Sequence, residues 1–199
     1  MTREQQPSTQ RLFTAVPLPP DIRHRIASLI DQLAEVVEGV RWVPEENLHI
    51  TLRFLGDCPP STVPVMAGAM RKAARHLPAQ VRIGGVGGFP SVRSARVVWV
   101  GVDDLTGAVE KVYNVLDKGA EKSGLGREGR KYRPHITIGR SRRKPVRIQE
   151  ELLAGFAAER FEMEVGEIVL FRSRLSNAGA SYSVVEAAGP GAPDEPMKG

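Results

Sequence analysis

The chain has 199 residues, 41% of them hydrophobic and 26% charged, which is typical of a globular protein with a single core. It contains no run of about 18 apolar residues, and the polar stretch 2–10 lacks the apolar region of a secretory signal, so we expect no membrane segment and a cytoplasmic location. The single cysteine, Cys58, excludes an intrachain disulfide and a multi-cysteine zinc site. No heptad pattern or long apolar surface run occurs, and we therefore expect a monomer.

Strand-like and helix-like segments alternate along residues 11–187, which we expect to form a single domain between a flexible leader (1–10) and a disordered tail (188–199). In chain order, the first expected elements are a strand over 11–16, a helix over 21–37, a strand over 48–55 and a helix over 61–77. Asp21 and Ser61 are the expected N-caps of the two helices.

The second half continues the alternation and ends in short strands. Its expected elements are, in chain order, strands over 81–86 and 97–102, a helix over 105–120, a strand over 134–140, a short helix near 148–153, and strands over 160–165, 168–172 and 182–185. Residues 177–179 are an expected turn, and the glycines of 84–88 suggest a bulged strand end. This order favours an α+β fold with antiparallel or mixed sheets.

Positive charge is concentrated in one segment. Between Arg127 and Arg147, nine Lys or Arg stand against one acidic residue, Glu128, so this segment carries +8 in a chain whose net charge is +5. Such a segment attracts polyanions whatever their sequence, although a solvated loop that only maintains solubility has the same composition.

One short pattern occurs twice. His49 and Thr51 in the first copy, and His135 and Thr137 in the second, form a His-x-Thr-x motif with apolar residues at both x positions. Because side chains alternate between the faces of a strand, each histidine shares a face with its threonine while the apolar residues face the core. The duplication suggests two related lobes of similar size.

Two imidazoles and two hydroxyls that converge on one site suit in-line attack at phosphorus. One imidazole takes a proton from the incoming oxygen, the other gives a proton to the departing oxygen, and the hydroxyls hold the non-bridging oxygens. Histidine serves both roles because its pKa of about 6.5 makes both forms accessible near neutrality. Structural strand histidines are the alternative, which the matched neighbours of the two copies make less favourable.

Other chemistries lack their residues. A zinc site would need further ligands, and neither an HExxH nor a CxxC motif occurs. There is no GxSxG elbow for a serine hydrolase, and the glycines of 84–88 lack the lysine of a phosphate-binding loop. We therefore expect neither a metal nor a cofactor.

With these residues in place, the chain resembles the two-histidine phosphoesterase superfamily, and within it the bacterial and archaeal RNA 2′,3′-cyclic phosphodiesterases, also described as 2′-5′ RNA ligases. The resemblance extends over most of 11–187. Its matching stretches are RLFTAVPLP (11–19), ENLHITLRFLGD (46–57), RVVWVGV (96–102), RKYRPHITIGR (130–140) and LFRSRLSNAGASYSVV (170–185).

This resemblance implies a bilobal, pseudo-twofold fold with antiparallel sheets lining a central cleft and helices outside. It implies an RNA 2′,3′-cyclic 3′-phosphodiesterase that leaves a 2′-phosphomonoester, with His49 as the general acid and His135 as the general base; the residue patterns alone leave that order open. The implied partner is an RNA with a 2′,3′-cyclic phosphate end, tRNA fragments and nucleotides included, and the reverse reaction would form a 2′-5′ linkage.

Further substrate contacts follow from the resemblance and from alternation. Arg140 matches a family arginine that contacts phosphate, and Arg53 falls on the face of His49 by simple alternation. Phe13 and Phe54 are candidates for stacking on a base, and Arg133 for extending the phosphate contacts. Two other functions remain open: a phosphodiesterase for small 2′-5′ or cyclic nucleotides, and an RNA-binding module with slow turnover.

Overall fold

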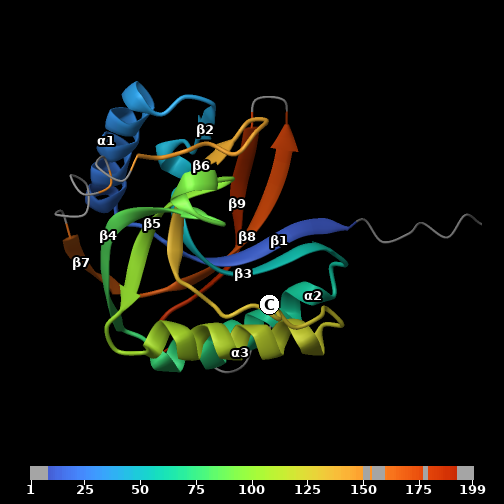
Figure 1. The fold of residues 1–199 in the computed structure, drawn as a ribbon. Helices are drawn as coiled ribbons and strands as arrows, with labels where there is room; N and C mark the ends of the chain where they lie inside the picture. Colours follow the sequence, from blue (N-terminus) through green and yellow to red (C-terminus); the bar gives the residue numbers. More distant parts are fainter. Residues whose placement is uncertain (1–8, 150–152, 154–159, 177–178, 192–199) are drawn as a thin grey trace, which may run out of the picture.

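One antiparallel sheet of nine strands organises the molecule in the computed structural model, which describes residues 9–149, 153, 160–176 and 179–191 (Figure 1). The strands are β1 (Gln10–Pro17), β2 (Val40–Trp42), β3 (His49–Cys58), β4 (Ala79–Phe89), β5 (Val97–Asp104), β6 (His135–Ser141), β7 (Arg160–Val165), β8 (Ile168–Ser176) and β9 (Gly179–Ala188). Their order across the sheet is β7-β4-β5-β6-β3-β1-β8-β9, and β2 pairs with β6. The expected α+β class is confirmed, with the expected antiparallel sheets joined into one.

The sheet consists of two four-stranded halves that meet between β6 and β3. Their pairing runs through Ile50 opposite Ile136, and both side chains are fully buried. The two strands that carry the His-x-Thr motifs are therefore neighbours at the centre of the sheet.

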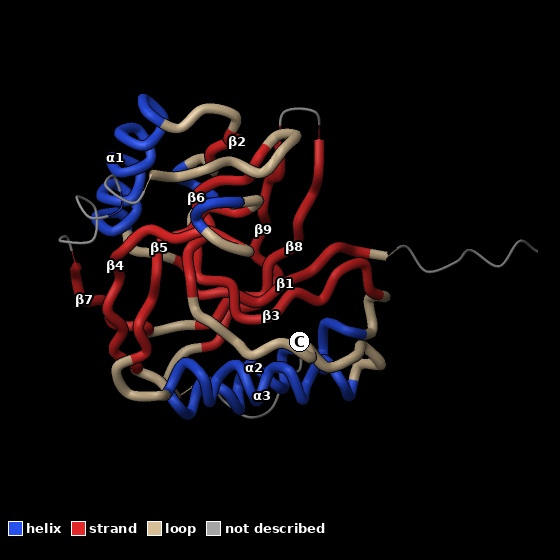
Figure 2. The backbone as a smooth tube through the Cα atoms, in the orientation of Figure 1, coloured by secondary structure: helices blue, strands red, loops and turns tan. Residues whose placement is uncertain are grey.

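In the described part of the chain three helices cover the sheet, and two of them lie side by side (Figures 1 and 2). They are α1 (Pro20–Val36), α2 (Thr62–Ala73) and α3 (Ala108–Lys122), and single 3-10 turns form η1 (Glu45–Asn47), η2 (Ala74–His76) and η3 (Val92–Ser94). The pair is α2 and α3, whereas α1 lies at the opposite end of the molecule. A Cβ at Gly119 would approach the Cβ of Ala69 to 2.5 Å, so the absence of a side chain at Gly119 permits the contact between α2 and α3.

The three long helices and the strands expected from the sequence are present, with differences at their ends. Helix α1 starts at Pro20, so Asp21 lies in its first turn and caps nothing; a proline at the first helical position leaves one fewer N–H to cap. Ser61 stands at the N-cap of α2 without a side-chain cap bond. Strand β9 continues to the buried Ala188, the first residue of the expected tail, and Gln10, the last residue of the expected leader, belongs to β1.

Four expectations fall partly outside the described residues. The flexible leader includes residues 1–8 and the disordered tail includes residues 192–199, none of which is described. The short helix near 148–153 includes residues 150–152, and the turn at 177–179 includes residues 177 and 178. No helix in the described part of the chain is both long and apolar enough to cross a membrane.

Candidate active site

The sheet brings both His-x-Thr motifs together on one face, which we call the motif face. Ile50 and Ile136 pair across the junction and point into the core. In an antiparallel pair, this register sets His49 beside Thr137 and Thr51 beside His135. The two histidines are then diagonal neighbours, on the order of 7–8 Å apart between backbones.

Both imidazoles are held by the chain two residues before them. The Nδ1 atom of His49 lies 2.8 Å from the carbonyl oxygen of Asn47, and that of His135 lies 2.7 Å from the carbonyl oxygen of Arg133. A carbonyl only accepts hydrogen bonds, so each Nδ1 carries a proton and donates it. Each Nε2 is therefore the nitrogen left to exchange protons with a substrate.

A shift of register follows the threonine in each motif strand. In the β1–β3 pair, Ala15 faces Thr51 and Thr14 faces Arg53, which leaves Leu52 unpaired. In the β5–β6 pair, Trp99 faces Thr137 and Val98 faces Gly139, which leaves Ile138 unpaired. Such bulges place two consecutive side chains on the core side, after which alternation resumes in the opposite phase.

The bulge in β3 overturns the expectation for Arg53. Simple alternation placed Arg53 on the motif face, but its side chain is only 10% exposed and faces the core side. Its Nε atom donates to Oδ1 of Asp117 on α3 at 2.9 Å, and its other nitrogens bond to the carbonyl oxygens of Phe54 and Gly126. Arg53 therefore holds β3 to α3 and does not face a ligand on the motif face.

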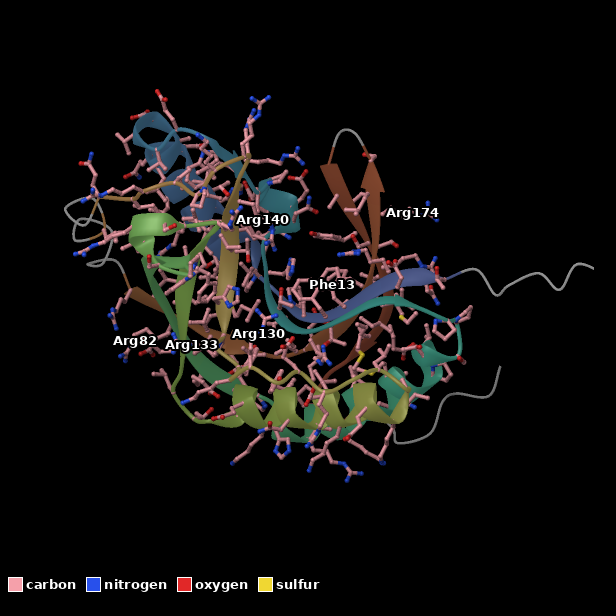
Figure 3. The ribbon with its side chains drawn as sticks, turned by 45° about the vertical axis from the view of Figure 1, so that its right-hand side comes forward. Phe13, Arg82, Arg130, Arg133, Arg140 and Arg174 are labelled. Atoms are coloured by element: carbon pink, nitrogen blue, oxygen red, sulfur yellow. The ribbon has the colours of Figure 1, made fainter. Side chains whose placement is uncertain are left out.

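The same bulges bring Phe54 and Arg140 to the motif face. Phe54 is 53% exposed, and its ring lies 5.8 Å from the ring of Phe13, which in turn contacts the imidazole of His49. The positive charge of Arg140 lowers the pKa of both His49 and His135, so this exposed side chain lies within electrostatic range of both imidazoles. Figure 3 shows Arg140 at the end of β6 beyond the second motif. Each of the two stands five residues after its motif histidine.

Phe13 lies beneath the site. It is 2% exposed, and its ring contacts His49 at 4.9 Å, Phe171 at 5.3 Å and Tyr182 at 4.9 Å. A side chain so enclosed has no free face for a base, so the expectation of stacking on Phe13 is wrong. It supports the His49 imidazole from below.

His135 has aromatic neighbours of its own. Its ring lies 5.1 Å from Phe89 and 6.4 Å from Trp99, edge-on to both. Any Cβ at Gly87 would collide with the indole of Trp99, so the bare backbone of β4 makes room for that ring. Gly85, with a φ of +72°, lies at the register shift between Gly84 and Val86; the expected bulge is present, inside β4 and not at its end.

Burial lowers the pKa of both motif histidines. For His49 the pKa falls from 6.5 to about 4; desolvation is the main cause, the Asn47 carbonyl opposes it, and the charges of His135 and Arg140 add to it. Burial also lowers the pKa of His135, which the Arg133 carbonyl raises and Arg140 lowers further. Near neutral pH both imidazoles are therefore neutral until an anion approaches, which raises both pKa values.

Two positioning residues escaped the sequence analysis. The hydroxyl of Tyr132 donates to the carbonyl oxygen of Thr51 at 3.1 Å, which joins the chain just before His135 to the first motif. The side chain of Asn47 donates to the carbonyl oxygen of Ala180 in β9 at 2.9 Å, which fixes the carbonyl that holds His49. In the sequence, these two residues are marked only by their positions, two residues before His49 and three before His135.

No group of three or more His, Cys, Asp or Glu side chains that would hold a metal ion occurs in the described part of the chain. Two surface hollows of about 640 Å³ each lie elsewhere, one beside Pro17 to Pro20 and one beside Arg11 and Arg172. Neither hollow is lined by a residue of the two His-x-Thr motifs.

The family model described as LigT like Phosphoesterase matches residues 16–99 and again residues 100–182. The chain belongs to the LigT-like phosphoesterase family. Each matched stretch contains one His-x-Thr strand, as the duplicated motif suggested. The resemblance to two-histidine phosphoesterases is thus confirmed.

Relatives and solved structures agree with this assignment. The chain is 33% identical over 173 residues to an RNA 2′,3′-cyclic phosphodiesterase of Archaeoglobus fulgidus, covering 86% of this chain and 96% of the relative. It is 34% identical over 182 residues to the protein of that name from Methanothermobacter thermautotrophicus, covering 88% and 96%. The structure of E. coli LigT complexed with 3′-AMP superposes with a TM-score of 0.73 at 26% identity, covering 92% of this chain and 99% of that one.

Proposed function

We propose that this LigT-like phosphoesterase hydrolyses the 2′,3′-cyclic phosphate at the end of an RNA to a 2′-phosphomonoester, without a metal ion. The observation that carries the proposal is the matched pair of imidazoles, each with Nδ1 bound to a carbonyl two residues back and Nε2 left for the substrate. The two relatives compared above are named RNA 2′,3′-cyclic phosphodiesterases, which supports the choice of substrate.

The reaction is a single displacement at phosphorus. His135 takes a proton from water at Nε2, and the water oxygen forms a new bond to phosphorus. The bond from phosphorus to O3′ breaks, and His49 gives the proton on its Nε2 to O3′. The phosphate stays on O2′, and the order of the two histidines follows the family pattern. With a 5′-hydroxyl in place of water as the attacking group, the same displacement forms a bond from O5′ to phosphorus, releases O3′ and leaves a 2′-5′ linkage.

The acid role of His49 depends on the substrate's charge. With a pKa of about 4, His49 is neutral at pH 7. A bound phosphate anion would raise this pKa and so offset the effect of desolvation. The carbonyl of Asn47 favours the imidazolium in the same way. We infer that His49 takes up its proton as the substrate binds.

Other side chains on the motif face contact the remainder of the nucleotide in this proposal. Thr51, Thr137 and Arg140 hold the non-bridging phosphate oxygens, where charge develops during the displacement. The exposed ring of Phe54 stacks on the terminal base, because an aromatic face binds any base at this position. Arg133 contributes charge at the other end of β6.

The test is incubation of the protein, in EDTA, with a short RNA that ends in a 2′,3′-cyclic phosphate, followed by identification of the product phosphate's position. His49→Ala and His135→Ala are compared with His76→Ala, which changes an exposed histidine outside the site. We expect a 2′-phosphate from the wild type and His76→Ala, and a rate at least 100-fold lower from each motif variant.

A 3′-phosphate product would reverse the leaving group and the assigned order of the histidines. A wild-type chain that binds the RNA without cleaving it would support the binding module with slow turnover. Turnover of 2′-5′ dinucleotides but not of the RNA would support the phosphodiesterase for small nucleotides.

A further inference from the structure

Basic side chains gather at the end of β6 that lies beyond the second motif. We call this group the basic rim; its members are Arg41, Arg140, Arg142, Arg143 and Lys144, and all five are exposed. Strand β2 and the loop after β6, which carry the rim, lie together at the top of the molecule in Figure 1.

Backbone contacts hold the rim together. Arg41 in β2 is the direct cross-strand partner of Arg140 in β6, and the N–H of Arg142 donates to the carbonyl oxygen of Gly39 at 2.9 Å. Because directly opposite residues share a face, Arg41 lies on the motif face with Arg140. The rim therefore starts beside the imidazoles and leads away from them.

The positive charges of the rim are not paired with acidic side chains of the described residues. None of its five members forms an ion pair with an acidic residue in the described part of the chain, and no acidic residue occurs between Gly139 and Gln149. Two arginines directly opposite one another repel, at a cost to the sheet that an anion between them would remove. Such an arrangement is typical of a surface built for a polyanion.

The basic residues before His135 are in a different situation. Arg127 pairs with Glu121 at 3.2 Å and with Asp117 at 3.7 Å, and Arg130 pairs with Glu128 at 3.2 Å. Figure 3 places Arg130 and Arg133 at one end of β6 and Arg140 at the other. The +8 segment thus has a partly neutralised half and an unneutralised half, on opposite sides of the site.

We propose that the basic rim binds the phosphates of the nucleotides that precede the reacting end of a single-stranded RNA. The proposal rests on the proposed function for the position of the terminal cyclic phosphate beside the imidazoles. From the reacting end, the RNA would run over β2 and the loop 142–144. A 2′,3′-cyclic mononucleotide has no preceding phosphate. It would therefore bind beside the imidazoles without contacting Arg142, Arg143 or Lys144.

The test compares two substrates and two triple variants. The rim variant is Arg142→Gln/Arg143→Gln/Lys144→Gln, and the control is Lys111→Gln/Lys118→Gln/Lys122→Gln, which removes the same charge from exposed positions of α3. The substrates are 2′,3′-cyclic AMP and a six-nucleotide RNA with a 2′,3′-cyclic phosphate end, assayed from 50 to 200 mM NaCl.

For the rim variant we expect kcat/KM on the hexanucleotide to fall by roughly tenfold at 50 mM NaCl. The slope of log kcat/KM against log salt concentration should also become shallower by about 2. Its kcat/KM on cyclic AMP should stay within twofold of the wild type, and the control should resemble the wild type on both substrates. Equal losses on both substrates, or equal behaviour of rim variant and control, would overturn the proposal.

Binding separates this inference from the proposed function. Fluorescence anisotropy with an uncleavable six-nucleotide RNA needs no turnover. If the wild type cleaves nothing but binds this RNA more tightly than the rim variant does, the proposed function fails and the rim stands. If wild type and rim variant bind it equally, the rim fails whatever the activity.

Discussion

Tyr132 connects the two motifs although it belongs to neither. Its hydroxyl bonds to the carbonyl of Thr51, its ring stacks on Tyr113 of α3 with centroids 4.2 Å apart, and burial raises its pKa well above the usual range, which keeps the hydroxyl a donor. The next residue along the chain supplies the carbonyl that holds His135. A single side chain thus fixes the loop on which the second imidazole depends.

Removal of this hydroxyl should change the chemistry more than the fold. In Tyr132→Phe the stacked ring remains, the loop loosens, and the Arg133 carbonyl no longer holds Nδ1 of His135 as firmly. Because that carbonyl raises the pKa of His135, its loss moves the limb of the kcat–pH profile that reports His135 to lower pH. We expect kcat to fall severalfold with little change in KM, and stability to fall by about 1 kcal/mol.

Tyr113→Phe is the matched control, because it removes the hydroxyl of the other stacked ring, and that hydroxyl forms no hydrogen bond within the described residues. An unchanged pH profile in Tyr132→Phe, or the same shift in both variants, would show that Tyr132 only supports the fold.

Residue-level prediction from the sequence succeeded where alternation held and failed where a bulge intervened. His49, Thr51, His135 and Thr137 precede their bulges, so the period-2 pattern placed each histidine beside its threonine. Arg53 follows a bulge, and its face was wrong because nothing in the string LHITLRFL marks the unpaired residue. The roles of these side chains in catalysis remain predictions.

At the scale of the elements, the contact between α2 and α3 depends on two small residues. Gly119 and Ala69 meet where the helices cross, and Met66 lies close by. The 3.6-residue periodicity predicted both helices and most of their buried faces, because burial of an apolar stripe is a local signal. It did not predict that the two helices pack on one another, because that depends on strands far apart in the sequence.

Gly119→Ala should therefore destabilise the protein. Alanine is normally the better helix former by roughly 0.5–1 kcal/mol, but its methyl group would be only 2.5 Å from the Cβ of Ala69. We expect overpacking to dominate and the free energy of unfolding in urea to fall by about 1–3 kcal/mol.

Gly68→Ala gives the comparison on the facing helix. A Cβ at Gly68 would meet only the end of the Arg71 side chain, at 4.0 Å, so this substitution should stabilise the protein slightly. A Gly119→Ala protein as stable as Gly68→Ala would mean that the helices separate at negligible cost.

At the scale of the whole molecule, the buried imidazoles couple folding to pH. The pKa of His49 is about 4 in the folded chain and 6.5 in an unfolded one, so between these values the unfolded chain binds a proton that the folded chain does not. The free energy of unfolding should fall as the pH falls through this window, by up to about 3 kcal/mol from His49 alone. His135 acts in the same direction.

Urea unfolding at pH 7 and pH 4.5 measures this dependence. His49→Gln should lose much less stability between the two pH values than the wild type, whereas His76→Gln, at an exposed position, should match the wild type. Parallel loss of stability in all three proteins would show that His49 is not the group responsible.

Phe54 and Arg140 occupy equivalent places in the two halves, each five residues after its histidine and beyond its bulge. Duplicated imidazoles by themselves would accept a ribose in either of two orientations related by the pseudo-twofold axis. The ring of Phe54 at one end and the guanidinium of Arg140 at the other would allow only one of these orientations, because the base would stack on Phe54 and the phosphate would bind Arg140. In the proposed reaction, the orientation of the substrate would therefore be set by the two positions at which the halves differ, whereas the paired histidines are the same in both halves.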